Sequence, residues 1–121
     1  AMTVKGLESR LIFQCNNDVD DLSDYLPYLR EYLNGAYDQL LLALEERHLD
    51  DAEYLSADTD TPSLLPGWSH VALADYATWC VYRNSNPVKQ QRGMQFYQAF
   101  LRIEARLRAE ALKGVQFYNV D

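Results

Sequence analysis

The sequence of 121 residues contains only two cysteines, Cys15 and Cys80, and they are far apart in the chain. Small domains that depend on disulfides are usually much richer in cysteine, so we do not expect a disulfide framework. We expect both thiols to be buried as small hydrophobic side chains.

Long apolar runs are also absent, because charged residues interrupt every hydrophobic stretch within a turn or two. A membrane-spanning helix needs about 20 mostly apolar residues, and a signal peptide needs a shorter apolar core. We therefore expect a soluble, cytosolic protein. The length fits a single domain covering residues 1–121, in which Ala1 before Met2 looks like the remnant of a tag.

Motifs for catalysis and for cofactor binding are missing as well. The sequence has no glycine-rich phosphate loop and no cysteine and histidine spacing typical of a metal site. His70 directly follows Ser69, His48 lies in a polar stretch, and no residue pair suggests a nucleophile with its base. We expect no enzymatic activity, no cofactor and no bound metal.

Two groups of acidic residues invite comparison with calcium sites. The first contains Asp18, Asp20 and Asp24, and the second contains Asp58 and Asp60. An EF-hand loop also needs a glycine at its sixth position and a glutamate at its twelfth, and neither group has them. We interpret both groups as solvated acidic segments.

The charge is divided unevenly along the chain. Residues 1–60 carry 14 acidic and 4 basic side chains, whereas residues 61–121 carry 4 acidic and 7 basic ones. Phosphate contacts dominate the affinity for nucleic acids, so the acidic half disfavours DNA binding. The asymmetry becomes important if copies of the chain meet, because one half can then attract the other.

What the sequence does contain is apolar residues at helical spacing. Four helices are predicted and no convincing strand. The first runs over residues 4–15 with Thr3 as its N-cap, and the second occupies most of residues 22–44. Ser23 or Asp24 should cap the second helix, so that Pro27 falls in its first turn. A close packing contact would explain Gly35 in its middle.

The second half of the chain is predicted to hold the two other helices. Residues 69–84 are apolar on nearly every side, so this helix should be central, with Trp79 in the core. Asp75 interrupts it and needs a partner, for which we expect Arg92 or a tyrosine hydroxyl. The fourth helix begins at the cap Asn86 with Pro87 in its first position and ends near Gly114. Its inner stripe consists of Phe96, Phe100, Ile103 and Leu107.

The predicted fold is therefore all-α: a single-domain bundle of about four helices, with a long acidic loop over residues 47–67 between the second and third helices. A short apolar tail, residues 115–121, follows the bundle. Loops of this length in compact domains are often functional or mobile.

The third and fourth predicted helices, with the short turn "NSNP" between them, resemble a DNA-reading helix-turn-helix. Such motifs use a short recognition helix whose first residues reach the base edges. Here the second helix spans about 25 residues and its middle faces the core. We interpret Lys89, Gln90, Gln91 and Arg92 as the polar outer turn of a core helix, and we expect no sequence-specific nucleic-acid binding.

Surfaces suited to protein contacts remain. Tyr25, Tyr28 and Tyr32 form a stripe about a quarter turn from the leucine stripe of the second helix. Tyrosine is favoured at interfaces, although these rings could equally cap the edge of the monomer core. Basic residues on the fourth helix and aromatic residues in the tail complete the predicted interface, which contains Arg102, Arg106, Arg108, Phe117 and Tyr118.

The order of these segments resembles a known family. The strings "DDLSDYLPYLREYLNGAYDQLL", "LPGWSHVALADYATWCVYRN" and "NPVKQQRGMQFYQAF" make residues 4–112 similar to the head–tail connector, or adaptor, proteins of tailed phages and prophages. The resemblance implies an all-α protein that forms a ring below the portal at the head vertex and helps to join the tail. Its partners would be other copies of itself, the portal protein and a tail-joining protein, in the virion.

This resemblance leaves several alternatives open. The isolated chain could be a monomer before it meets the portal. A second hypothesis is a small helical regulatory protein that binds one host or phage protein and forms no ring. The two hypotheses predict different assembly states, because only the adaptor should form high-order oligomers.

Overall fold

The computed structural model describes residues 1–15, 18–19, 22–44 and 54–113. In these ranges every regular element is helical, which confirms the predicted all-α bundle. The elements are α1 (Val4–Cys15), α2 (Leu22–Tyr25), the 3-10 helix η1 (Leu26–Tyr28), α3 (Leu29–Ala43), the 3-10 helix η3 (Gly67–Ser69), α4 (Val71–Arg83) and α5 (Pro87–Leu112).

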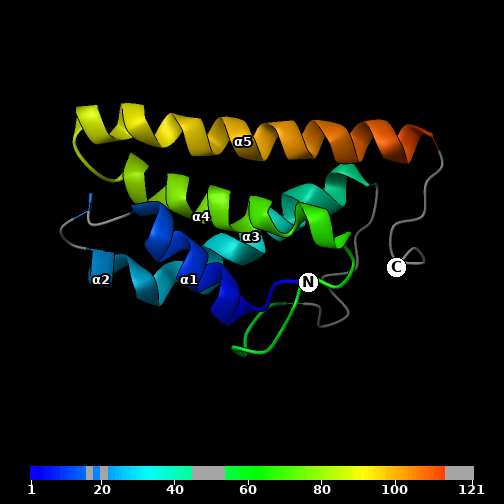
Figure 1. Ribbon diagram of the computed structural model, residues 1–121, viewed down its shortest axis with the longest axis horizontal. Helices are drawn as coiled ribbons and strands as arrows, with labels where there is room; N and C mark the ends of the chain where they lie inside the picture. The colour runs from blue at the N-terminus through cyan, green and yellow to red at the C-terminus, as the bar shows by residue number, and fades with distance from the viewer. Residues whose placement is uncertain (16–17, 20–21, 45–53, 114–121) are drawn as a thin grey trace.

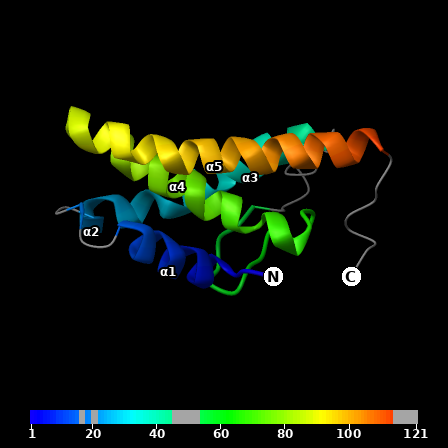
Figure 2. The same ribbon diagram turned by 45° about the horizontal axis from the view of Figure 1, so that its top comes forward.

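Helix α4 is the centre of the bundle, as predicted from its apolar composition. It packs against α5, α3 and α1. Figure 1 shows α5 lying along the whole length of the molecule with α4 beside it, and Figure 2 shows α1 and α3 flanking α4. Because α4 is covered on several sides, nine of its 13 residues are buried.

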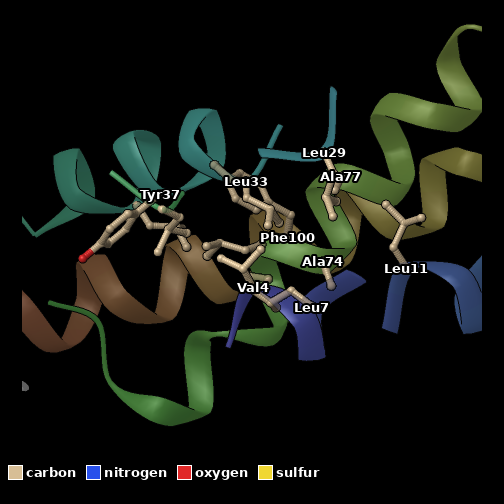
Figure 3. Close-up of a cluster of buried hydrophobic side chains, with 14 of the residues drawn as sticks. Val4, Leu7, Leu11, Leu29, Leu33, Tyr37, Ala74, Ala77 and Phe100 are labelled. Atoms are coloured by element: carbon tan, nitrogen blue, oxygen red, sulfur yellow. The ribbon is translucent and has the colours of Figure 1, made fainter. Parts of the chain in front are cut away.

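The core forms where the apolar stripes of these four helices meet. Both cysteines are buried and free, as predicted, and burial raises the pKa of each thiol to about 11. Figure 3 shows part of this core, with α1, α3, α4 and α5 contributing the labelled side chains of Val4, Leu7, Leu11, Leu29, Leu33, Tyr37, Ala74, Ala77 and Phe100.

Helix α1 begins where its sequence predicted. The hydroxyl of Thr3 accepts a hydrogen bond from the backbone N–H of Gly6 at 3.1 Å. The acidic loop satisfies two further amides of the first turn, because Val4 N–H donates to the carbonyl of Asp60 at 2.8 Å and Lys5 N–H to that of Asp58 at 3.0 Å. The loop therefore stabilises the start of α1.

The second predicted helix is not continuous, and this part of the prediction was wrong. It is divided into α2, η1 and α3, with Pro27 inside η1. Proline has no N–H to donate, and its ring clashes with the carbonyl four residues earlier, here that of Ser23. Ser23 and Asp24 consequently lie inside the short helix α2 and do not cap the long one.

The expected close contact at Gly35 is also absent. A Cβ atom at this exposed position would lie 3.9 Å from Tyr76, which is an ordinary van der Waals distance. The tight glycine contact is instead between α4 and α5. There a Cβ atom on the buried Gly93 would lie only 2.4 Å from the Cβ atom of Tyr82, so glycine lets the two helices approach closely.

Polar residues stabilise the turn between α4 and α5, the segment whose sequence resembles a DNA-reading helix-turn-helix. The side chain of Asn86 accepts from the backbone N–H of Lys89 at 3.0 Å, and Pro87 follows in the first position of α5, as predicted. The amide of Gln90 donates to the carbonyls of Arg83 at 3.1 Å and Ser85 at 2.9 Å. These residues cap helix ends, and α5 continues for 26 residues.

The acidic loop is more ordered than predicted where the structure describes it. Residues 45–53 lie outside the described part, but Leu55 and Leu65 are buried in the core. The side-chain amide of Asn34 bonds both the N–H of Leu55 at 2.8 Å and its carbonyl at 3.0 Å. Residues 54–66 therefore cross the start of α1 and are anchored to the bundle by a few buried residues, while many of their other side chains stay exposed (Figure 1).

Candidate protein-interaction surface

A cluster of aromatic rings lies at the edge where α4 meets α5. Trp79 was predicted to be in the core, but its ring is only half-buried. The ring of Tyr97 on α5 covers it. The two rings stack with centroids 4.3 Å apart. The rings of Tyr76 and Trp79 meet edge to face, with their centroids 5.5 Å apart. Tyr76 in turn lies 5.0 Å from the buried ring of Phe100. The cluster thus joins the core to the surface.

The predicted tyrosine stripe lies on the same side of the bundle. Tyr28 is 52% exposed, whereas Tyr25 and Tyr32 are half-buried against the core. Burial raises the pKa of Tyr32. Among its neighbours, Cys80, Tyr25 and Tyr28 raise that pKa further and Arg83 lowers it, so all four lie near its hydroxyl. The structure therefore brings the three predicted tyrosines together within electrostatic reach.

Cys80 and Arg83 also affect the pKa of Tyr76, which burial again raises: Cys80 raises it further and Arg83 lowers it. Tyr32 and Tyr76 consequently border the same stretch of α4, and the tyrosine stripe joins the cluster around Trp79. We call this surface the aromatic face and define it as Tyr28, Tyr32, Tyr76, Trp79 and Tyr97.

One cation belongs to the aromatic face. The guanidinium of Arg83 lies over the Trp79 ring, 4.5 Å from its centroid. An exposed contact of this kind contributes on the order of 0.5–1 kcal/mol. The sequence contained a signal for it, because Trp79 and Arg83 are four residues apart and neighbours on a helix surface.

Two of the three predicted basic residues of α5, Arg102 and Arg106, lie on its other flank, whereas Arg108 lies on the same flank as Tyr97. Tyr97 and Arg102 are five residues apart, which places them roughly 140° apart around the helix. The charges of Arg102 and of Arg10 on α1 both act on the carboxyl group of Asp75, so the two arginines lie near each other on the α1 side. We call Arg10, Arg102 and Arg106 the basic face.

Arg106 is partly engaged within its own chain. Its guanidinium lies 3.9 Å from the centroid of the Trp68 ring, and its Nε is 3.5 Å from a carboxylate oxygen of Glu110. Arg10 and Arg102 are exposed, and neither has an ion pair or hydrogen bond in the described part of the chain. These two arginines are the cations of the basic face that are free to meet another surface.

Asp75 has a partner other than the ones we expected. Its carboxylate accepts from the amide of Gln14 at 2.7 Å, and the amide oxygen of Gln14 accepts from the Thr78 hydroxyl at 2.6 Å. Burial raises the pKa of Asp75 despite this hydrogen bond. We had expected Arg92 or a tyrosine hydroxyl as the partner of Asp75. This was wrong, because Arg92 and the hydroxyl of Tyr82 bond Asp18 instead.

Asp18 ties the segment after α1 to both central helices. It accepts from the Tyr82 hydroxyl at 2.9 Å and from the Arg92 guanidinium at 2.6 Å. The bond from Tyr82 lowers the pKa of Asp18 most, followed by the bond and charge of Arg92. We had interpreted this acidic group as a solvated segment, but Asp18 is bonded within the fold.

Asp58 and Asp60, the second acidic group, also bond to other residues of the chain. Asp58 pairs with Arg30 at 2.6 Å, and Asp60 accepts from the backbone N–H groups of Ser56 and Ala57, each at 2.9 Å. These backbone bonds lower the pKa of Asp60. Of the residues placed in the structure, no three histidine, cysteine or acidic side chains could together hold a metal. Asp20 lies outside the described residues.

His70 has a structural position. Its Nδ1 accepts from the backbone N–H of Met2 at 3.1 Å, and its Nε2 lies 3.0 Å from the carbonyl of Leu65, to which it donates. Burial lowers the pKa of the imidazole, which keeps it neutral and suits this pair of bonds. The ring fastens the start of the chain to the end of the acidic loop. His48 lies outside the described residues.

Comparisons with known proteins give no relative from which a role for the aromatic and basic faces could be taken. No protein-family model, no curated protein and no solved structure matches the chain. Among the described helices, none is both long enough and apolar enough to cross a membrane. Phe117 and Tyr118, which were predicted to belong to the interface, lie outside the described residues.

Proposed function

We propose that the protein is a structural adaptor whose copies associate head to tail, with the aromatic face of one copy against the basic face of the next. In a head-to-tail contact each copy contributes two different surface patches, and repeated contacts close into a ring if the rotation between copies permits it. The two faces lie on opposite flanks of α5, so one copy can use both at once.

The observation that carries this proposal is the complementary chemistry of the two faces. Three carboxylates are exposed on the helices next to Tyr28 and Tyr32: Asp24 on α2, and Glu31 and Asp38 on α3. None of them has an ion-pair partner in the described part of the chain. The opposite flank offers the guanidinium groups of Arg10 and Arg102. Opposite charges favour and orient such an encounter.

The aromatic face also has the side chains that contribute most to binding energy. Tryptophan, tyrosine and arginine are enriched among the residues whose truncation weakens interfaces most. Aromatic rings can accept guanidinium groups over their faces, as Trp79 and Trp68 already do within the chain. An arginine from a neighbouring copy would find several such rings on this face.

Within this class we propose a head–tail connector of a tailed phage or prophage, which forms a ring below the portal after assembly in the host cytoplasm. The sequence strings that resemble this family support the specific role, and the two unlike faces support assembly between copies. The portal and a tail-joining protein would be the further partners. A ring through which DNA passes must not grip it, and the acidic balance of the chain suits that requirement.

Charge reversal on the basic face tests the proposal. The variant Arg10→Glu with Arg102→Glu should shift sedimentation towards the monomer, while its helix content stays unchanged because both side chains are exposed. Lys5→Glu with Lys89→Glu is the matched control, since it changes the net charge equally and Lys89 lies in the first turn of α5, far from Arg102. Raised salt should also weaken assembly of the unmodified chain.

Equal assembly of the unmodified chain and both variants would remove the basic face from the contact and contradict the head-to-tail arrangement. An unmodified chain that stays a monomer or dimer at every concentration would favour the alternative, a small helical regulator that binds one protein partner.

A further inference from the structure

A buried carboxylate lies beneath the basic face. Asp75 on α4 is only 7% exposed, and its Oδ1 accepts from the side-chain amide of Gln14 at 2.7 Å. Its Oδ2 has no hydrogen bond or ion pair in the described part of the chain. No side-chain oxygen in that part is both fully buried and without a partner, so Oδ2 reaches the surface. The fold therefore fixes one oxygen of Asp75 and leaves the other open.

Helix α1 brings Arg10 to one side of this open oxygen. Arg10 precedes Gln14 by four residues, so the two side chains are neighbours on the surface of α1. Because Gln14 is bonded to Asp75, Arg10 lies within one helical turn of that bond. Its exposed guanidinium has no ion pair in the described part of the chain, so it is free to turn towards another carboxylate.

Helix α5 brings Arg102 to the other side. Helices α4 and α5 run antiparallel across their short turn, and the ring of Tyr76 contacts that of Phe100 (Figure 1). Asp75 precedes Tyr76, so its neighbours on the antiparallel helix lie just after Phe100, at the level of Arg102.

The electrostatics of Asp75 agree with this placement. Burial raises the pKa of its carboxyl group, and the bond from Gln14 and the charges of Arg10 and Arg102 lower it. Among the described residues of the helices packed against α4, α1 contributes Arg10, α5 contributes Arg102, and α3 contributes no charge that acts on this carboxyl group. Two arginines thus share one buried carboxylate without forming an ion pair with it.

We propose that a carboxylate of the neighbouring copy docks between these two arginines, and that docking adds a proton from the solvent to Oδ2 of Asp75. The proposal rests on the proposed function and adds its regulation by pH. The docking carboxylate comes from the acidic group Asp24, Glu31 and Asp38. One O–H bond forms, the buffer supplies the proton, and the neutral carboxyl group donates this O–H to the incoming carboxylate.

Repulsion between two carboxylates is the reason for the proton uptake. In the free copy the two guanidinium groups offset the charge of Asp75. In the contact they turn to the incoming carboxylate, and the neighbouring copy covers Oδ2 and removes its water. A nearby negative charge and a loss of water both favour the neutral form of a carboxyl group. Two carboxyl groups that meet in this way share one proton.

Proton uptake makes the association stronger as pH falls. If the associated state binds one proton more, the association constant rises about tenfold for each pH unit, until Asp75 is also protonated in the free copy. Exposed carboxyl groups ordinarily stay ionised down to about pH 5. The range from about pH 7.5 to about pH 5.5 therefore reports on Asp75.

Sedimentation equilibrium at both ends of this range tests the proposal. The association constant of the unmodified chain should be at least about tenfold larger at the lower pH. Asp75→Asn imitates the neutral carboxyl group and should associate equally well at both pH values. Both histidines remain in this variant, so any contribution of theirs appears in both chains. Glu8→Gln is the matched control, since it removes a carboxylate that pairs with Lys5, and it should keep the pH dependence.

The outcomes separate this proposal from the proposed function. Equal association of the unmodified chain at both pH values would overturn the proton uptake and leave the head-to-tail contact in place. A full pH dependence in Asp75→Asn would do the same. A chain that associates at neither pH would contradict the proposed function and this proposal with it.

The proton can also be followed without a substitution. NMR of the side-chain carboxyl carbon reports the ionisation of Asp75 in the unmodified chain. The proton affinity of Asp75 should be at least about tenfold higher in concentrated, associated samples than in dilute, monomeric ones. Equal proton affinity in the two samples would overturn the proposal, even if Asp75→Asn failed to fold.

Discussion

The same substitution at two helical glycines should change stability in opposite directions. Replacing Gly93 by alanine would put its new Cβ atom 2.4 Å from the Cβ atom of Tyr82. At Gly35, the new atom would meet only Tyr76 at 3.9 Å, and the position is exposed. Both variants gain the same helix propensity, so their difference isolates the packing of α4 against α5.

The magnitudes follow from these distances. Carbon atoms in contact are normally about 3.5–4.0 Å apart. A Cβ atom added to Gly93 would lie only 2.4 Å from the Cβ atom of Tyr82, which is more than 1 Å too close. A Cβ atom cannot move without its backbone, and the Tyr82 hydroxyl is held by Asp18. Overpacking costs about 1–3 kcal/mol, here at the upper end, while helix propensity returns about 1 kcal/mol. We expect Gly93→Ala to lose about 2 kcal/mol and Gly35→Ala to gain roughly 0.5–1 kcal/mol.

Urea unfolding followed by circular dichroism measures both effects. With an m-value of about 1–3 kcal/mol/M, the midpoint should fall by roughly 0.7–2 M for Gly93→Ala and rise by a smaller amount for Gly35→Ala. The reasoning is refuted if Gly93→Ala is as stable as the unmodified chain, or if Gly35→Ala is the less stable of the two variants.

Three other substitutions test the buried polar groups and Trp79. Asp75→Asn should be more stable than the unmodified chain at pH 7 and lose this advantage towards pH 4. The reason is that the pKa of the Asp75 carboxyl is raised in the folded state, so the unmodified fold loses stability as pH rises. Urea titrations at both pH values would show the difference. His70→Ala should lower the free energy of unfolding by about 1–3 kcal/mol at pH 7, because the bonds to Met2 and Leu65 are lost. The loss should be smaller near pH 5. The lowered pKa of the imidazole already destabilises the unmodified fold as pH falls below about 6.5. Trp79→Ala should lose about 2 kcal/mol in urea unfolding, less than the ~3–5 kcal/mol of a core tryptophan, because its ring is half-buried; a core-sized loss would contradict its placement.

Features set by neighbouring residues were the ones that the sequence predicted well. Thr3 and Asn86 cap helices through bonds that span three residues, and Cys15 completes an apolar stripe on one helix. The division at Pro27 was also encoded locally. It was missed because the leucine periodicity continues through the proline, so the apolar pattern hid a backbone interruption.

Features that depend on distant residues could not be predicted in the same way. Gln14, the partner of Asp75, is 61 positions away, so no local pattern connects them. The burial of Trp79 depends on how far α5 covers α4, and only the structure gives that. For the candidate surface, the sequence indicated the tyrosines and the arginines separately. Their division onto two flanks of α5 required the arrangement of all four helices.

The most direct test of the proposed function is electron microscopy of the purified, unmodified chain at high concentration and low salt. The account predicts closed rings of one subunit number, because a head-to-tail contact between rigid bundles repeats with a fixed rotation. Particles that are only monomers or two-fold symmetric dimers would contradict it, since a two-fold dimer joins the same patch on both copies.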